Sequence, residues 1–169
     1  MGYARRGMDI LLMVKLLCLL GAANGAPVVA AKLLGARFGR ALDGGWRFVD
    51  GRPLFGPSKT WRGLVVAVAG GAVVAVPLGW SWQLGAGVAL AAMAGDLISS
   101  FIKRRLGLPS SSMCLGLDQV PEALLPLLLL WPVLGMTPVA AVVIVAAFFV
   151  AELSLSWLLY QVRWRDQPW

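Results

Sequence analysis

Long apolar runs constrain this sequence more than any other feature. Five of them approach the roughly 20 residues that a helix needs to cross a bilayer. They cover about 8–34, 64–80, 83–102, 119–134 and 138–160. The chain is 59% hydrophobic, which exceeds the usual apolar share of soluble domains, and its mean hydropathy is +0.79. We therefore expect one all-α integral membrane domain over 1–169 with about five transmembrane helices.

Basic side chains mark one side of the membrane. The connections 35–63 and 103–118 are rich in Lys and Arg, as is the tail up to Arg165, whereas the connections near 79–82 and 135–138 carry no charge. Cytoplasmic loops hold the excess of Lys and Arg in multi-pass proteins. The pattern therefore predicts a cell-membrane protein with its N-terminus outside and its charged loops in the cytoplasm. Because orientation explains the net charge of +7, no nucleic-acid partner is expected.

The chain contains no histidine and only two cysteines, Cys18 and Cys114. This composition excludes every mechanism that needs an imidazole base, and it excludes the usual His/Cys zinc sites. Chemistry must therefore come from carboxylates, lysines and arginines. The sequence leaves the oligomeric state open.

The run "AGDLISSFIKRRLG" ends the third predicted span with polar residues on one helical face. Asp96, Ser99 or Ser100, and Lys103 are spaced i, i+3 or i+4, and i+7. Asp96 lies about two turns inside the boundary that Lys103 sets. An ionisable side chain at that depth is costly and usually lines a cavity or pairs with a cation. The alternative is that Asp96 pairs with Lys103 or an arginine and only holds helices together.

The stretch "GLDQVPEALLP" offers two more carboxylates at the start of the fourth predicted span. Asp118 precedes Pro121, so a plain helix N-cap is one interpretation. Glu122 follows four residues later on the same face. Carboxylate oxygens are the ligands that Mg²⁺ prefers, with phosphate oxygens completing its octahedron.

The segment "GRPLFGPSKT" resembles a phosphate-binding loop without matching one. Pro57 and Ser58 are inserted before Lys59, and a proline removes an N–H that a phosphate cradle would use. Lys59 and Arg62 still suit a polyphosphate. Asp43 and Asp50 in the same connection can bind a metal, bind a sugar hydroxyl or pair with arginines.

The first and last predicted spans each contain a buried polar residue. Asn24 lies in "AANGAPV", where the following glycine and Pro27 predict a broken or kinked helix beside a cavity. This makes Asn24 a candidate for substrate contact. Glu152 lies in the last span, where a basic partner is one explanation and no function is assigned.

Together, "ANGAP", "VDGRPLFGPSKTWRG", "GDLISSFIKRRLGL" and "LDQ" resemble the CDP-archaeol synthase family of archaeal membrane enzymes. The resemblance implies transfer of CMP from CTP to 2,3-di-O-geranylgeranylglyceryl phosphate, an unsaturated di-ether lipid, with release of pyrophosphate. A more distant similarity to bacterial phosphatidate cytidylyltransferases covers Ser99, Lys103, Arg104 and Asp118. That pattern continues with a Lys-Asp pair where this chain has Leu108 and Pro109.

The resemblance also implies roles for individual residues. Asp96, Asp118 and Lys103 are expected to be catalytic, with Asp96 and Asp118 holding Mg²⁺. The residues expected to bind CTP or the lipid phosphate are Asn24, Asp43, Asp50, Lys59, Thr60, Arg62, Ser99 and Arg104. They are expected to surround a polar cavity that opens to the cytoplasm for CTP and sideways to the bilayer for the lipid.

A small transporter or channel for anionic or phosphorylated solutes is the alternative. The sequence shows no internal repeat of the kind on which many transporters are built. An alcohol phosphotransferase acting on CDP-lipids is disfavoured, because the chain lacks repeated aspartates on adjacent helical turns. CTP, a phosphorylated di-ether lipid and the bilayer are therefore the expected partners.

Overall fold

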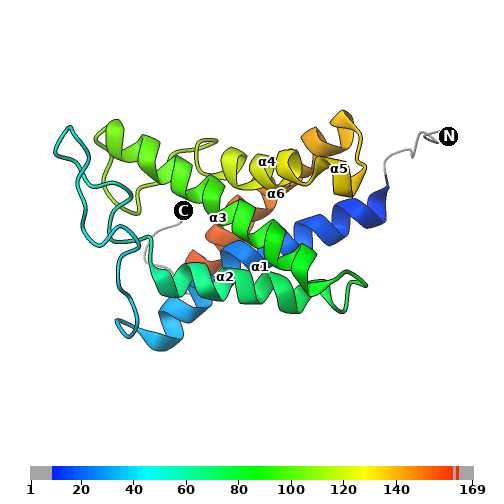
Figure 1. The fold of residues 1–169 in the computed structure, drawn as a ribbon, viewed down its shortest axis with the longest axis horizontal. Coiled ribbons are helices and arrows are strands. Elements are labelled where there is room, and N and C mark those ends of the chain that lie inside the picture. The colour runs from blue at the N-terminus through cyan, green and yellow to red at the C-terminus, as the bar shows by residue number, and fades with distance from the viewer. Residues whose placement is uncertain (1–8, 162, 164–169) are drawn as a thin grey trace.

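The computed structural model describes residues 9–161 and 163, and the regular structure in this part of the chain is helical (Figure 1). The helices are α1 (Ile10–Leu34), α2 (Trp61–Ala75), α3 (Trp82–Arg105), α4 (Gln119–Leu129), α5 (Trp131–Leu134) and α6 (Pro138–Gln161). By length and composition, α1, α3 and α6 can each cross a membrane, and α2 and α4 are shorter apolar helices. The predicted all-α membrane fold is confirmed. Arg165 lies outside the described residues.

Helix α1 is continuous through the stretch where the sequence suggested a break. Asp9 begins the helix by accepting a hydrogen bond from the Leu12 N–H, and Pro27 lies inside it. Pro27 cannot donate a backbone hydrogen bond to the preceding turn. Nearby, the Asn24 side-chain amide donates to the Leu20 carbonyl at 3.2 Å, one turn earlier. The polar side chain is therefore accommodated within an unbroken helix.

Local sequence sets where the shorter helices end. The Thr60 hydroxyl caps α2 by accepting from the Gly63 N–H at 3.1 Å, and Gly79 has a positive φ in the turn that follows the helix. The predicted span 119–134 is divided at Leu130 into α4 and α5. Pro132 in the first turn of α5 has no N–H with which to continue the α4 ladder.

Helix α3 packs against α1, α2 and α4 and so places its polar end inside the bundle. Two contacts require glycine because the backbones nearly touch. A Cβ on Gly85 would lie 2.2 Å from the Gly71 carbonyl oxygen, and one on Gly95 would lie 2.2 Å from the Pro121 carbonyl oxygen. The second contact brings the start of α4 against the middle of α3, next to Asp96.

Two connections meet at one end of the bundle, on the left in Figure 1. One joins α1 to α2 and the other joins α3 to α4. The Ser58 and Ser110 hydroxyls, one from each connection, lie 3.1 Å apart. These two loops therefore form a joint cover over the polar end of α3.

Candidate functional site

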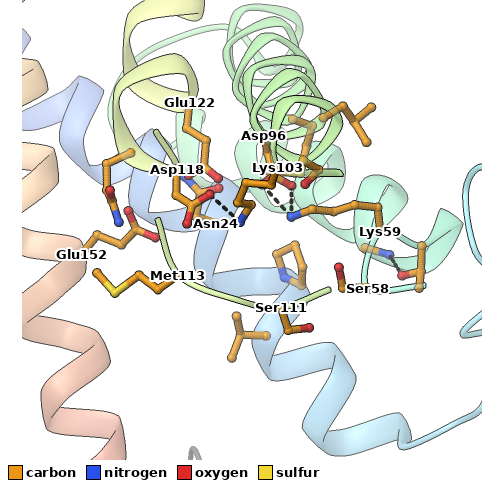
Figure 2. A pocket seen from close by; sticks show the side chains of 18 of the residues that line it. Asn24, Ser58, Lys59, Asp96, Lys103, Ser111, Met113, Asp118, Glu122 and Glu152 are labelled. Carbon is orange, nitrogen blue, oxygen red and sulfur yellow. Dashed lines mark hydrogen bonds and ion pairs between the residues drawn. The ribbon is translucent and has the colours of Figure 1, made fainter. Parts of the chain in front are cut away.

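A cavity of about 580 Å³ lies beneath this cover. Helices α1, α2, α3, α4 and α6 contribute to its wall, together with both loops. Its volume is within the range of ligand-binding pockets, and it contains lysine, arginine, aspartate and glutamate side chains. Figure 2 shows that Lys59, Asp96, Lys103, Asp118 and Glu122 point into the same space, although they come from two loops and two helices.

Lys59 and Asp96 form the first of two ion pairs in the cavity. The lysine ammonium lies 2.6 Å from one carboxylate oxygen of Asp96 and 2.5 Å from the other. Lys59 immediately precedes the Thr60 cap of α2, which fixes the direction in which the loop approaches α3. The side chains are 24% and 15% exposed, so the pair borders the cavity without being sealed.

Lys103 and Asp118 form the second ion pair, at 2.5 Å. The Lys103 ammonium also donates to the Ser112 carbonyl at 2.9 Å, and the Cys114 N–H donates to Asp118 at 2.8 Å. Asp118 makes no side-chain capping bond to α4, so it is not the plain N-cap that was considered. The alternative pairing of Asp96 with Lys103 is also wrong, because Asp96 pairs with Lys59 and Lys103 pairs with Asp118.

Two glutamates in the cavity carry no role in the sequence-based assignment. Glu122 is 5% exposed, and its Oε2 atom has no hydrogen-bond partner among the described residues. Its carboxylate interacts electrostatically with Asp96, Glu152 and Lys59. Glu152 reaches the same cavity from α6. An acid within a predicted span is itself a signal of function, and that signal was present in the sequence for both residues.

The serine that faces the cavity is Ser100, whereas Ser99 is fully buried and donates to the Gly95 carbonyl at 3.0 Å. Spacing does not decide between the two serines, because i+3 and i+4 from Asp96 lie equally far on either side of the stripe through Asp96 and Lys103. Arg104 lines the cavity and also donates to the Pro109 carbonyl at 2.8 Å. Asn24 and Thr60 line it as well.

Asp43 lies outside the cavity lining and organises the loop instead. Its carboxylate accepts hydrogen bonds from the N–H groups of Gly45, Phe55 and Gly56 at 2.9–3.0 Å. Burial raises the pKa of Asp43, but these N–H donors outweigh burial and bring the pKa below its ordinary value. The aspartate thus acts as a staple for the residues that precede Lys59.

Two other predicted ligands also have contacts outside the cavity lining. Asp50 pairs with Arg105 at 2.7 Å. The Arg62 guanidinium donates to the Gly35 and Arg37 carbonyls at 2.7 and 2.6 Å, tying the end of α1 to the start of α2. Neither residue borders the cavity that Lys59 and Lys103 share.

The donor set suits a hard divalent cation. Among the described residues, no three His, Cys, Asp or Glu side chains form a ready-made metal cluster. Mg²⁺ is commonly held by one or two carboxylates together with water and substrate phosphates. Asp96 and Asp118 both face the cavity, and Glu122 adds a buried oxygen without a hydrogen-bond partner there. These oxygens fit Mg²⁺ if phosphate supplies the remaining ligands.

Comparison with known proteins gives one consistent result. A family model described as "CarS-like: CDP-archaeol synthase" matches residues 8–169. The CDP-archaeol synthase of Thermococcus onnurineus is 34% identical over 160 residues, covering 87% of this chain and 89% of the relative. That of Methanopyrus kandleri is 37% identical over 155 residues, covering 85% of this chain and 88% of the relative.

A solved structure extends the comparison to the fold. It is described as an intramembrane enzyme for archaeal membrane lipids biosynthesis. The TM-score is 0.71 at 34% sequence identity, covering 86% of this chain and 90% of that one. This chain therefore belongs to the CDP-archaeol synthase family.

Proposed function

We propose that this protein transfers CMP from CTP to the phosphate of an unsaturated archaeal di-ether lipid, 2,3-di-O-geranylgeranylglyceryl phosphate. The products are CDP-archaeol and pyrophosphate. The observation that carries the proposal is the cavity in which Lys59, Lys103 and Arg104 face Asp96 and Asp118, in a chain that belongs to the CDP-archaeol synthase family. Such a cavity suits two anionic substrates brought together with a cation.

The reaction needs no general base. The lipid phosphate is already an anion, so one of its oxygens attacks the α-phosphorus of CTP directly. A new P–O bond forms there while the bond from the α-phosphorus to the bridging oxygen breaks, and pyrophosphate leaves with that electron pair. Positioning and charge neutralisation carry most of phosphoryl transfer. A chain without histidine can supply both.

Each lysine has to exchange its partner when substrate binds. Lys59 and Lys103 neutralise Asp96 and Asp118 in the structure described here. In the proposed reaction, both ammonium groups turn to the phosphates, and Arg104 adds a third positive charge. Thr60, Asn24 and Ser100 supply polar contacts from the wall. Four further residues support the site through the contacts described above and are not assigned to a substrate: Asp43, Asp50, Arg62 and Ser99.

Mg²⁺ is the cation that we assign to this exchange. Asp96 and Asp118 would hold it, with Glu122 as a further carboxylate beside Asp96. When bound, the ion would neutralise the phosphate oxygens and hold them in place. The carboxylates that the lysines release would in this way keep a positive partner.

The proposed setting is a multi-pass protein with about five spans, with its N-terminus outside and its cavity open to the cytoplasm. The basic connections 35–63 and 103–118 support this orientation. Val28 and Ala31 of α1 and Leu153 of α6 give one wall of the cavity an apolar surface. Such a wall suits a lipid that reaches the cavity sideways while its tails stay in hydrocarbon.

Nucleotide-dependent stability tests the proposal against the transporter alternative. We expect CTP with Mg²⁺ to raise the unfolding temperature of the detergent-solubilised protein, and a cytidylyl-lipid product to form only with a phosphorylated lipid. ATP, GTP and UTP are the matched nucleotides, and the dephosphorylated lipid is the matched acceptor. Uptake of phosphorylated solutes into vesicles without any nucleotide dependence would favour the transporter instead.

A further inference from the structure

The α1–α2 connection is tied to the end of α3 by one arginine. The Arg105 guanidinium pairs with Asp50 at 2.7 Å and donates to the carbonyls of Arg52 and Pro53 at 3.3 and 2.5 Å. The Arg105 side chain is 20% exposed and that of Asp50 is 35% exposed, so the contacts lie at the surface of the loop with the arginine itself mostly covered. Three acceptors on one guanidinium use the planar fork that distinguishes arginine from lysine.

Aromatic rings complete the setting of Arg105. Its guanidinium carbon lies 4.8 Å from the centre of the Phe48 ring and 4.9 Å from that of Phe101. The two rings meet edge to face with their centres 5.3 Å apart. Phe48 belongs to the loop and Phe101 to α3, so the cation joins two elements through both charge and packing.

A second arginine, Arg52 of the loop, makes contacts in the opposite direction, from the loop to the end of α3. The Arg52 guanidinium donates to the carbonyls of Arg104 and Arg105 at the C-terminal end of α3. The tip of the loop is itself rigid, because the Phe48 N–H donates to the Arg52 carbonyl at 2.8 Å and the Gly51 N–H donates to the Phe48 carbonyl at 2.9 Å. We call Phe48, Asp50, Arg52, Pro53 and Arg105 the clasp.

The clasp lies outside the cavity but next to the residues that enter it. None of its five members is among the described residues that line the cavity. Six residues after Pro53 the chain reaches Lys59, whose ammonium contacts Asp96. Between them, the Asp43 staple holds Phe55 and Gly56. A fixed hairpin tip thus restricts where Lys59 can go.

We propose that Arg105 is a positioning residue that holds the α1–α2 loop closed over the cavity, so that Lys59 is presented to the CTP phosphates before the nucleotide arrives. This inference rests on the proposed cytidylyl transfer. Loss of the clasp leaves the loop partly open, and apparent CTP affinity falls in proportion to the closed fraction. Saturating CTP closes the loop again, so turnover at saturation is kept.

Steady-state kinetics of three single variants test this at fixed, saturating lipid phosphate. We expect Arg105→Met to raise the KM for CTP about tenfold or more while kcat per folded molecule stays within about twofold. Arg105→Lys should behave like Arg105→Met, because lysine lacks the planar fork whose two nitrogens reach Asp50 on one side and the two carbonyls on the other. Arg47→Met is the matched control, since Arg47 bonds the Gly51 carbonyl within the hairpin tip and should leave KM unchanged.

Asp50→Asn separates positioning from direct contact with CTP. If Arg105 acts through the clasp, Asp50→Asn raises KM as well, and the double variant with Arg105→Met adds little further. If KM stays the same or falls in Asp50→Asn, Arg105 is free to bind phosphate directly and the proposal is wrong. A fall in kcat with KM unchanged, or full function in Arg105→Lys, would also overturn it.

Hydrogen exchange keeps the clasp testable without catalysis. Backbone amides of 54–60 should exchange faster in Arg105→Met and Asp50→Asn than in the wild type or Arg47→Met. Equal exchange rates in all four proteins would reject the clasp whatever the kinetics show. If the wild type forms no cytidylyl-lipid, the proposed function fails, and faster exchange in the two clasp variants would still show that Arg105 orders the loop.

Discussion

At the scale of single residues, we propose that two lysines and two aspartates carry the chemistry. Lys59 neutralises Asp96, and Lys103 neutralises Asp118, with all four side chains bordering one cavity. Charges this close to the membrane interior are stable only as pairs. The pairs therefore hold the substrate-free site together, and in the proposed reaction phosphate and a cation take their places.

Asp96→Asn should abolish turnover while the protein stays folded. The amide keeps the shape of the carboxylate but neither its charge nor its ability to balance the cation and Lys59, so we expect a loss of about 10²-fold or more in kcat. Activity per molecule and the unfolding temperature in detergent are the measurements. Asp9→Asn is the control, because asparagine also caps a helix such as α1. Retained activity with a large drop in stability would mean that Asp96 only joins helices.

Lys59→Met and Lys103→Met should each weaken CTP binding by about ten- to a hundredfold. The basis is the loss of one charged phosphate contact, which contributes about 1.5–3 kcal/mol in a partly desolvated site. Equilibrium binding of CTP in the presence of Mg²⁺ measures the effect. Lys32→Met, at the exposed end of α1, is the matched control. Wild-type affinity in both cavity variants would leave these lysines with a role in membrane orientation alone.

Lys59→Met should have the opposite effect on the binding of a divalent cation in the absence of nucleotide. Removing the Lys59 ammonium leaves the Asp96 carboxylate without its partner at 2.5 Å and therefore open to another positive charge. Mn²⁺ binding to the nucleotide-free protein, followed by electron paramagnetic resonance, should be tighter in Lys59→Met than in the wild type. Weaker or unchanged Mn²⁺ binding would show that lysine and cation do not compete for Asp96.

The Asp43 staple should give the loop an acid-sensitive component of stability. The pKa of Asp43 is lower when folded than its ordinary value of 3.8, so the unfolded chain binds the proton more readily. Its stabilising effect is complete above pH 3.8 and is lost as pH falls through the folded pKa. The unfolding temperature of Asp43→Asn should therefore lie below that of the wild type at pH 7, and the gap should narrow below pH 3.8. A gap that does not change with pH would contradict this role.

At the scale of elements, close contacts between helices bring the polar residues of the site together. Gly95 lets α4 approach α3 until a Cβ on Gly95 would lie 2.2 Å from the Pro121 carbonyl oxygen. This contact brings Glu122 on α4, and Asp118 in the turn before α4, towards Asp96 on α3. The polar cluster therefore depends on a residue that has no side chain.

Gly95→Ala should lower both activity and thermal stability, because the α3–α4 contact cannot accept a methyl group without moving backbone. Gly87→Ala in the same helix is the matched control. Nothing lies within 4 Å of a Cβ at Gly87, so the change should be neutral or stabilise by about 0.5–1 kcal/mol. Activity assays and thermal unfolding of both variants check this. Equal behaviour of the two variants would mean that the close contact is not needed.

Elements were predictable from sequence where hydropathy determines them. The apolar runs located all the longer helices, and the cap formed by Thr60 explains where α2 begins. Two details escaped this reasoning. Helix α1 continues through Pro27, and Leu130 divides the run 119–134. Packing around a helix decides whether a proline interrupts it, and a pattern of residues does not contain that packing.

Which side chains pair with each other was harder to predict than which side chains lie in the site. Asp96, Asp118, Lys59 and Lys103 were all identified, but which lysine meets which aspartate depends on how the loops fold back. Asp43 and Asp50 show the same limit, since loop N–H groups and Arg105 take up their carboxylates. The choice between Ser99 and Ser100 was open as well, because both lie equally close to the helical stripe through Asp96 and Lys103 and only the packing of α3 decides which serine faces the cavity.

At the scale of the whole molecule, the account places the polar end of the bundle in the cytoplasm. Single cysteines at Val49 and Gln83, in a protein with Cys18 and Cys114 replaced by serine, test this in intact cells. Val49 is 93% exposed in the α1–α2 loop, and Gln83 is exposed in the first turn of α3 at the opposite end. A membrane-impermeant thiol reagent should label position 83 and spare position 49. The reverse pattern would reject the proposed orientation.

Transfer of CMP from CTP to the lipid phosphate is tested most directly by following a radioactive or isotopic label from CTP into the lipid. Purified protein is incubated with Mg²⁺, 2,3-di-O-geranylgeranylglyceryl phosphate, and CTP labelled at either the α- or the γ-phosphate. We expect the α-label to enter the lipid fraction and the γ-label to leave as pyrophosphate in equal amount, and we expect Asp96→Asn to form neither product. Folded wild-type protein that binds CTP but leaves the lipid unlabelled, or that transfers the γ-phosphate to it, would contradict the account.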